Sequence, residues 1–366
     1  MKKETDIMIE LIDKPKIIIS NPESKHRYFA WPSIARLQDG RIAVSCSGFR
    51  IEHVCPFGKA CVSFSSDNGE TYTPPTPIID TVLDDRDAGI VPFGESGVIL
   101  TSFNNTVDFQ RKANPDDKYI NAYLDTVSEA EEKEAVGAEF CISNDCANTF
   151  GKIMKSPVTS PHGPAVLKDG TILWVGRIFS DHDSYTDGEQ GVQCYRVNTD
   201  GTMVKVGEID TDEYYRFCEP HMVECSDGRL VCHLRSDTLF TIFQSESFDK
   251  GRTWTKPNRI LGDNGGAPSH IIRTSKNMLV AAYGYREMPY GIKLMFSLDN
   301  GETWDTDHII YENTNSDDIG YPATIELDDG SFLTVFYARP GNYEHSVIMQ
   351  QKWKLKTDDS SQNLNI

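Results

Sequence analysis

The sequence is short of positive charge and of long apolar runs, and each shortage excludes a class of protein. Lys and Arg together number 36 against 55 Asp and Glu, which gives a formal net charge of −19 at pH 7. A general binder of nucleic acid or of an anionic membrane needs a basic face, so we expect neither kind of partner. No run in the sequence approaches the roughly 20 apolar residues of a membrane-spanning helix.

Cysteine motifs are also missing. The nine cysteines show no paired C-x2-C spacing of the kind that zinc sites use, so we expect no metal and no cofactor. Residues 1–16 contain no continuous apolar stretch of the kind that a signal peptide needs. We therefore expect a cytoplasmic protein whose thiols stay reduced.

What the sequence does contain is one hairpin pattern that occurs six times. Each copy has two β-type runs joined by a short turn centred on Gly or Asn, which is a strong hairpin signal. The copies recur at intervals of roughly 50 to 70 residues, a spacing typical of repeat folds. They cover residues 31–50, 88–104, 163–177, 217–235, 267–286 and 321–339.

A shorter pattern, S-x-D-x-G-x-T-aromatic, lies between some of the hairpins. Complete copies contain Asp67, Asp249 and Asp299, and a degenerate copy contains Asp145. An Asp carboxylate can accept hydrogen bonds from the backbone of a tight turn, and the aromatic residue can anchor that turn on the sheet. We interpret these aspartates as structural rather than catalytic.

The two patterns together supply four strands per repeat, which indicates a β-propeller. We predict an all-β fold: a six-bladed β-propeller of four-stranded antiparallel blades, forming one domain over residues 1–355. Residues 16–19 are expected to complete the last blade beside residues 346–353, and residues 356–366 to form a polar tail.

One segment breaks the repeat. Residues 106–136 are rich in helix formers and predict a helical insertion in the second blade. The insertion could pack on the outside of the propeller, act as a lid or form an oligomer contact.

The hairpin topology places the start of each first strand and the end of each second strand on one face of the propeller. An arginine ends the second strand in five repeats: Arg50, Arg177, Arg235, Arg286 and Arg339. The first strands open with Trp31, Asp87, His162, Glu219, His270 and Tyr321. Guanidinium groups bind carboxylates and phosphates in a bidentate way, so this mouth is predicted to bind an anionic ligand despite the acidic composition.

The repeats and the Asp-containing turns resemble the sialidase superfamily, also called BNR or Asp-box proteins, over nearly the whole chain outside the insertion. In that family a glutamate opening the fourth blade activates a tyrosine nucleophile that opens the sixth. An aspartate is the acid/base, and three arginines bind the substrate carboxylate.

Carried over by motif, the resemblance implies roles for four residues. Glu219, followed by a proline and ahead of Arg235, matches the glutamate and one arginine. Tyr321, followed by Pro where the family has Ser, matches the nucleophile, and Arg286 matches a further arginine.

The chain departs from the family at two positions. The first arginine of the family lies in an Arg-Ile-Pro motif, whereas this chain has Trp31 before the proline; its replacement would be Arg27, Arg50 or Arg86. The loop after the first hairpin, residues 51–57, has no aspartate. Our candidate acid is Asp87, and the alternatives are Asp85, Glu52 and His53.

These residues predict an exo-acting retaining glycoside hydrolase that removes a terminal acidic sugar from a small molecule or glycan. A phenol with a pKa near 10 is a weak nucleophile unless a base accepts its proton. A neutral phenol also approaches an anionic sugar with less repulsion than a carboxylate does. The missing arginine leaves open an inactive carbohydrate-binding propeller, and a lyase or transglycosidase could use the same scaffold.

Overall fold

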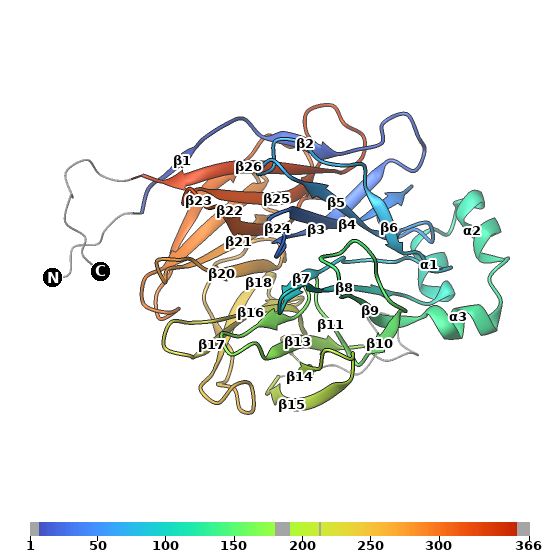
Figure 1. Cartoon of the computed structure of the whole chain (residues 1–366). Helices are drawn as coiled ribbons and strands as arrows, with labels where there is room; N and C mark the ends of the chain where they lie inside the picture. The colour runs from blue at the N-terminus through green and yellow to red at the C-terminus, as the bar shows by residue number, and fades with distance from the viewer. Residues whose placement is uncertain (1–6, 180–190, 212–213, 357–366) are drawn as a thin grey trace.

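The computed structural model describes residues 7–179, 191–211 and 214–356. Within these residues the strands form six antiparallel sheets, and the inner strands contact one another in a closed ring, β3, β7, β12, β16, β20, β24 and back to β3. The predicted six-bladed propeller is therefore confirmed, and Figure 1 shows the blades around their common centre. The predicted tail beyond residue 356 lies outside the described residues.

Blades one to three follow the first half of the chain. Blade one is β3 (Tyr28–Arg36), β4 (Ile42–Arg50), β5 (Lys59–Ser65) and β6 (Thr76–Ile79). Blade two is β7 (Ile90–Phe93), β8 (Gly97–Asn104), β9 (Gly137–Ser143) and β10 (Met154–Ser156). Blade three joins β11 (Val158–Thr159) and β12 (Ala165–Val166) to β13 (Ile172–Ile178), β14 (Val192–Val197) and β15 (Met203–Ile209).

Blades four to six complete the ring. Blade four is β16 (Phe217–Glu224), β17 (Leu230–Ser236), β18 (Thr241–Ser247) and β19 (Asn258–Arg259). Blade five is β20 (Ser269–Arg273), β21 (Leu279–Tyr285), β22 (Gly291–Ser297) and β23 (Asp305–Tyr311). Blade six is β24 (Gly320–Glu326), β25 (Phe332–Ala338) and β26 (Val347–Leu355), with β1 (Ile9–Leu11) and β2 (Lys16–Ile19) paired to β26.

The last blade is closed by the N-terminal segment, as the sequence predicted. Strand β2 pairs antiparallel with β26, with Ile17 opposite Met349. Strand β1 continues along the same strand, with Ile9 opposite Leu355. Pairing segments from both ends of the chain in one sheet closes the ring of blades.

The Asp-containing turns have the structural role assigned to them. The carboxylate of Asp249 accepts hydrogen bonds from the backbone N–H and the hydroxyl of Thr253, at 2.9 and 2.7 Å. The indole of Trp254 donates to the carbonyl of Gly251 at 3.0 Å and packs on the blade-four core. The same pattern of bonds recurs at Asp67, Asp145 and Asp299.

The predicted insertion contains α1 (Val107–Ala113), α2 (Lys118–Leu124) and α3 (Glu129–Ala135), which project together from one side of the propeller (Figure 1). It packs on the loop between β4 and β5. Ile120 and Leu124 form an apolar cluster with Cys55, and the Asn114 amide donates to the Val54 carbonyl at 2.9 Å. The insertion therefore fixes the conformation of a loop of blade one.

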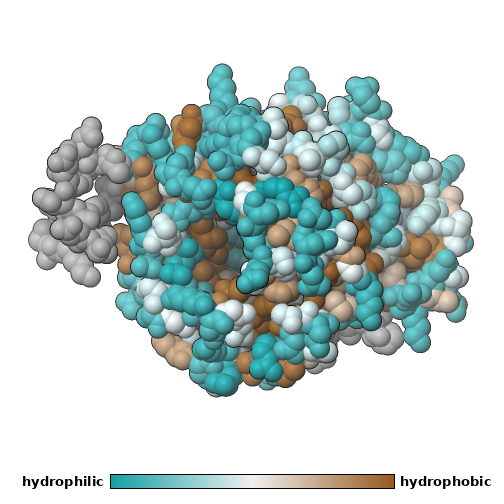
Figure 2. All heavy atoms as spheres, in the orientation of Figure 1, coloured by the Kyte–Doolittle hydropathy of each residue, from teal (hydrophilic) through white to brown (hydrophobic). Residues whose placement is uncertain are grey.

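The face shown in Figure 2 is mainly hydrophilic, with scattered apolar side chains. All nine cysteines lie within the described residues and are free, and all except Cys146 are buried. Among the described helices, none is both long enough and apolar enough to cross a membrane.

Candidate active site

A pocket of about 210 Å3 lies where the inner strands of blades one, two, four and six begin. Its wall combines charged, aromatic and amide side chains. The lining residues are Trp31, His53, Val54, Arg86, Asp87, Phe103, Asn105, Phe109, Glu219, Arg235, Arg286 and Tyr321.

Four of these side chains are presented by an unusual backbone feature. Trp31, Asp87, Glu219 and Tyr321 all have φ between 48 and 52°, in the left-handed region that residues other than glycine rarely adopt. At Trp31, Glu219 and Tyr321 the ladder register also shifts, and proline follows. Proline has no N–H to donate, so it suits a bulge, and a bulge redirects the side chain beside it. Such strain, repeated around one pocket, is typical of functional sites.

Blades three and five have the same X-Pro pattern but no functional side chain before the proline. The corresponding residues are Gly163 and Ala267. This difference explains why the pocket lies toward blades one, two, four and six.

Tyr321 and Glu219 are in direct contact at the pocket. The Tyr321 hydroxyl donates a short hydrogen bond to Glu219 Oε1. Arg235 Nη1 lies 2.6 Å from Glu219 Oε2 and 3.3 Å from the Tyr321 hydroxyl, and its Nη2 lies 2.9 Å from Asp237. Burial and the charge of Glu219 raise the pKa of Tyr321 well above its ordinary value, although the nearby arginines oppose the shift. The phenol therefore keeps its proton at rest and has an acceptor in contact with it.

Two further guanidinium groups face the pocket. Arg286 is fixed by bonds from Nε to the Ile319 carbonyl at 2.9 Å and from Nη2 to the Tyr337 hydroxyl at 3.0 Å. Arg86 bonds to Asp84 at 3.1 Å, and its guanidinium carbon lies 4.0 Å from the centroid of the Trp31 ring. With Arg235, they place three cationic groups around a small volume.

Asp87 is the pocket carboxyl that the sequence suggested as the acid. Burial and the negative charge of Glu219 raise the pKa of Asp87 to about 7, although neighbouring arginines oppose the shift. Asp87 is therefore substantially protonated near neutral pH.

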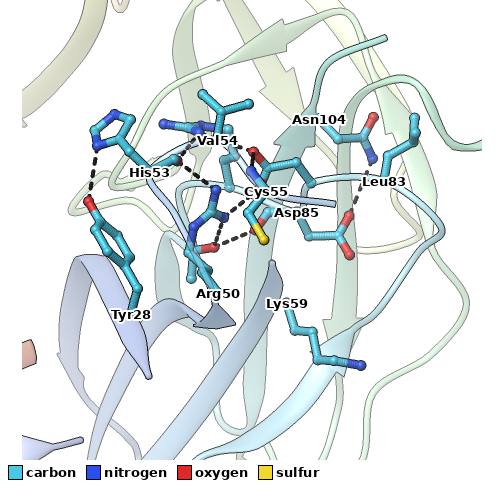
Figure 3. Close-up of polar contacts among 12 residues, drawn as sticks. Tyr28, Arg50, His53, Val54, Cys55, Lys59, Leu83, Asp85 and Asn104 are labelled. Carbon is cyan, nitrogen blue, oxygen red and sulfur yellow. Dashed lines mark hydrogen bonds and ion pairs between the residues drawn. The ribbon is translucent and has the colours of Figure 1, made fainter. Parts of the chain in front are cut away.

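The other acid candidates occupy different positions. Asp85 does not line the pocket. It accepts from the Thr81 backbone at 2.7 Å and from the Asn104 amide at 3.3 Å, and Figure 3 shows the second of these bonds. Glu52 is exposed and does not line the pocket, whereas His53 does.

Arg50 was predicted to bind substrate but is fully buried. It pairs with Asp84, which is also 0% exposed, and donates to the His53 carbonyl at 2.7 Å. Its guanidinium carbon is 4.7 Å from the centroid of the Trp31 ring. Arg50 thus supports the pocket wall from behind.

The remaining predicted arginines also lie outside the pocket lining. Arg177 is buried near Phe179, and Arg339 pairs with Asp318 at 2.7 Å. The prediction that all five repeat arginines converge on the mouth is therefore wrong, since only Arg235 and Arg286 line it. Of the three suggested replacements for the missing arginine, Arg86 reaches the pocket, whereas Arg27 forms an exposed pair with Glu344.

His162 and His270 were expected at the mouth, but they are buried together with His221. The three rings lie 4.4–5.4 Å apart between centroids. His270 accepts from the Thr324 backbone at 3.3 Å, and His221 from the Ile271 backbone at 3.1 Å. These bonds link neighbouring inner strands. Within the described part of the chain, no group of three or more such side chains has the geometry to hold a metal ion.

Four lining residues were not anticipated. Val54 lies in the loop after β4, Phe103 is the penultimate residue of β8, Asn105 follows β8, and Phe109 lies in α1. Nothing in the repeat pattern signals them. The proline that follows Trp31 and Tyr321, in contrast, can be recognised in the sequence, and it indicates a bulge at these two positions.

Comparison with known proteins fixes the family. The model of the BNR repeat-like domain matches residues 141–334, more than half of the chain. The chain belongs to the sialidase-like BNR-repeat superfamily. No curated protein matches this BNR-repeat protein in sequence.

Solved structures share the fold of this BNR-repeat protein over nearly its whole length. A protein of unknown function from Dyadobacter fermentans DSM 18053 has a TM-score of 0.77 at 18% identity, covering 95% of this chain and 99% of its own. The intramolecular trans-sialidase from Ruminococcus gnavus has a TM-score of 0.64 at 14% identity, covering 94% and 98%. The NanB sialidase from Streptococcus pneumoniae has a TM-score of 0.65 at 15% identity, covering 93% and 70%. At such identities the likeness establishes the fold alone, so the activity has to be argued from the site.

Proposed function

We propose that this protein is an exo-acting retaining glycoside hydrolase that removes a terminal acidic sugar. The observation that carries the proposal is the hydrogen bond from the Tyr321 hydroxyl to Glu219, with Arg235 in contact with both groups. A phenol becomes a competent nucleophile when an adjacent carboxylate accepts its proton.

In the first step the Tyr321 oxygen attacks the anomeric carbon while its proton moves to Glu219. The bond to the leaving oxygen breaks, and a covalent glycosyl-tyrosine forms. Water then displaces the tyrosine and gives a proton to the residue that protonated the leaving oxygen, while the tyrosine takes its own proton back from Glu219. Two displacements at one carbon restore the starting configuration, so the product has the same anomeric configuration as the substrate.

The charges around the pocket support an anionic substrate. Arg86, Arg235 and Arg286 all line it, in a protein whose net charge is −19. Guanidinium groups bind carboxylates with paired hydrogen bonds that contribute about 1.5–3 kcal/mol each. The volume of about 210 Å3 is below the roughly 300–1,000 Å3 of sites for drug-sized ligands, which suits one terminal sugar rather than a chain.

The leaving oxygen also needs a proton. Asp87 and His53 are the pocket residues proposed to supply it, the first because its pKa of about 7 keeps a proton available, the second because it lies at the pocket opening.

The test is a panel of 4-methylumbelliferyl glycosides of sialic acid, of related 2-keto acids and of uronic acids. The wild-type protein should hydrolyse one acidic member, and NMR should show the retained anomer as the first product. Tyr321→Phe should abolish hydrolysis but keep binding, and the exposed Tyr343→Phe should match the wild type.

Each alternative activity has its own outcome. Hydrolysis by Tyr321→Phe would refute the nucleophile, and binding without turnover by the wild type would indicate an inactive carbohydrate-binding propeller. An unsaturated or anhydro product would indicate a lyase or an intramolecular transglycosidase instead.

A further inference from the structure

His53 is held more firmly than an ordinary loop residue. The ring nitrogen Nδ1 lies 3.0 Å from the Tyr28 hydroxyl and 3.3 Å from Asp318 Oδ1, and the ring packs edge-on against Trp31 at 5.0 Å between centroids. Its carbonyl accepts from Arg50 and from Arg86, each at 2.7 Å. Figure 3 shows the bond to Tyr28 and the loop that carries the ring.

The group behind His53 is a fixed carboxylate. Asp318 accepts hydrogen bonds from Tyr28 at 2.9 Å, from Arg339 at 2.7 Å and from Ser346 at 3.1 Å. Burial opposes its ionisation, but the contacts with His53 and Arg339 outweigh burial and hold the pKa of Asp318 well below its ordinary value. His53 therefore faces a permanent negative charge.

This arrangement sets the tautomer of His53. The single proton of the Tyr28 hydroxyl goes to Asp318, so both neighbours of Nδ1 can only accept from it. Nδ1 keeps its hydrogen, and Nε2 is the nitrogen that gains and loses a proton. Within the described residues, Nε2 makes no hydrogen bond.

His53 also lies where a leaving group must be. The side chain is 51% exposed, whereas Tyr321 and Asp87 are each 5% exposed. An enzyme that encloses only the terminal sugar leaves the rest of the glycan outside, so the glycosidic oxygen lies at the pocket opening. Asp87 is only 5% exposed and lies close enough to Glu219 for that charge to raise its pKa, so it is enclosed deeper in the pocket than His53.

We propose that His53, oriented by Asp318 and Tyr28, is the general acid and base of the reaction, and that Asp87 instead donates a hydrogen bond to the enclosed sugar. This inference rests on the proposed hydrolase function. As the Tyr321 oxygen bonds to the anomeric carbon, the electron pair of the breaking C–O bond goes to the leaving oxygen, which takes the Nε2 proton. In the second step neutral Nε2 takes a proton from water, the water oxygen bonds to the anomeric carbon, and the tyrosyl C–O pair returns to the phenol.

The charges around His53 set the pH dependence. Partial burial lowers the pKa of His53, the hydrogen bond to Asp318 raises it, and the guanidinium groups of Arg86 and Arg50 lower it, with a net decrease. The donor form is the imidazolium, so activity on substrates that need a proton should fall as the pH rises past a value below about 6.5.

The test compares two glycosides of the hydrolysed sugar, one with a 4-nitrophenyl and one with a methyl leaving group. Methoxide needs a proton to leave, whereas 4-nitrophenoxide does not. His53→Gln should lower kcat/KM on the methyl glycoside by about 10²–10⁴-fold, and that on the 4-nitrophenyl glycoside by less than about 10-fold. Azide, which attacks without a base, should accelerate turnover of the 4-nitrophenyl glycoside by the variant and give the glycosyl azide.

Asp87→Asn is the matched comparison, because it should lower kcat/KM on both glycosides by the same factor. Asp318→Asn tests the positioning role of Asp318. Loss of the negative charge should shift to lower pH the fall of kcat/KM for the methyl glycoside that occurs as the pH rises. The pH profile of kcat/KM for the 4-nitrophenyl glycoside should not shift. Circular dichroism and retained sugar binding verify the fold of each variant.

Equal losses on both glycosides for His53→Gln, or a loss that depends on the leaving group for Asp87→Asn, would overturn the assignment of His53 while leaving the hydrolase intact. Activity in Tyr321→Phe, or a wild type that turns over no acidic glycoside, would overturn the proposed function itself and with it this inference.

Discussion

Asp84 is the carboxylate on which the wall of the pocket depends. It is 0% exposed, pairs with Arg50, which is also 0% exposed, and with Arg86 at 3.1 Å, and accepts from the Cys55 backbone at 3.0 Å. The two guanidinium groups hold the pKa of Asp84 below its ordinary value although burial opposes them, so the carboxylate is ionised.

Replacement of Asp84 by Asn should destabilise the protein strongly. Asparagine keeps the shape but removes the charge. Arg50 is then buried without a counter-ion, and Arg86 loses the carboxylate that it pairs with. Removal of one partner from a buried ion pair costs about 3–5 kcal/mol, because the remaining charge stays desolvated. That is a large part of the roughly 5–15 kcal/mol by which proteins of this kind are stable.

The measurement is urea unfolding of the wild type, Asp84→Asn and Asp80→Asn. Asp80 pairs with Lys59 at the surface, with the side chains 48% and 30% exposed, so its loss should cost less than about 1 kcal/mol. Asp84→Asn should also weaken sugar binding, since Arg86 loses its ion pair and keeps only the hydrogen bond to the His53 carbonyl. A loss below about 1 kcal/mol for Asp84→Asn would show that the ion pair contributes little and would refute the reasoning.

Two further predictions concern regions outside the pocket. Burial lowers the pKa of His221 to about 4, whereas the pKa of a histidine in an unfolded chain is near 6.5. As the pH falls, the unfolded state therefore takes up the proton first. The stability that is present above pH 6.5 is lost as the pH falls toward 4. The shift corresponds to about 3 kcal/mol, so His221→Gln should lose less stability than the wild type between pH 7 and 4.5 in urea unfolding; equal losses would contradict this. Asp249→Ala should lower the unfolding free energy by about 1 kcal/mol through the loss of its turn bonds and leave kcat/KM unchanged, and a large fall in kcat/KM would show that this turn is not purely structural.

Local chemistry explains how much of the fold could be predicted. Asp-Gly turns between β-type runs, and the S-x-D-x-G-x-T turns after them, depend only on neighbouring residues, so they are visible without a partner strand. The sequence also predicted that residues 16–19 complete the last blade, because the sixth repeat lacks one of its four strands. The placement of α1 to α3 against the loop around Cys55 did not follow, because an amphipathic segment does not reveal what its apolar face contacts.

The site was predictable in part for the same reason. Glu219, Tyr321 and Asp87 open inner strands, and a ring topology alone brings strand openings together. The arginines were misjudged because a residue at a strand end can turn toward the pocket, as Arg286 does, or into a buried ion pair, as Arg50 does. For Arg50 that choice depends on Asp84, a carboxylate in the loop between β6 and β7.

The sequence by itself therefore determined the number of blades and the strands within them, which rest on repeating local patterns, and its resemblance to the sialidase superfamily singled out Tyr321 and Glu219. Only the tertiary structure decided that Arg86 takes the position beside Trp31 and that His53 meets Asp318, residues 265 positions apart in the chain. Hydrogen bonds and ion pairs act over a few ångströms between groups that the closed ring brings together, and no spacing in the sequence records which groups those are.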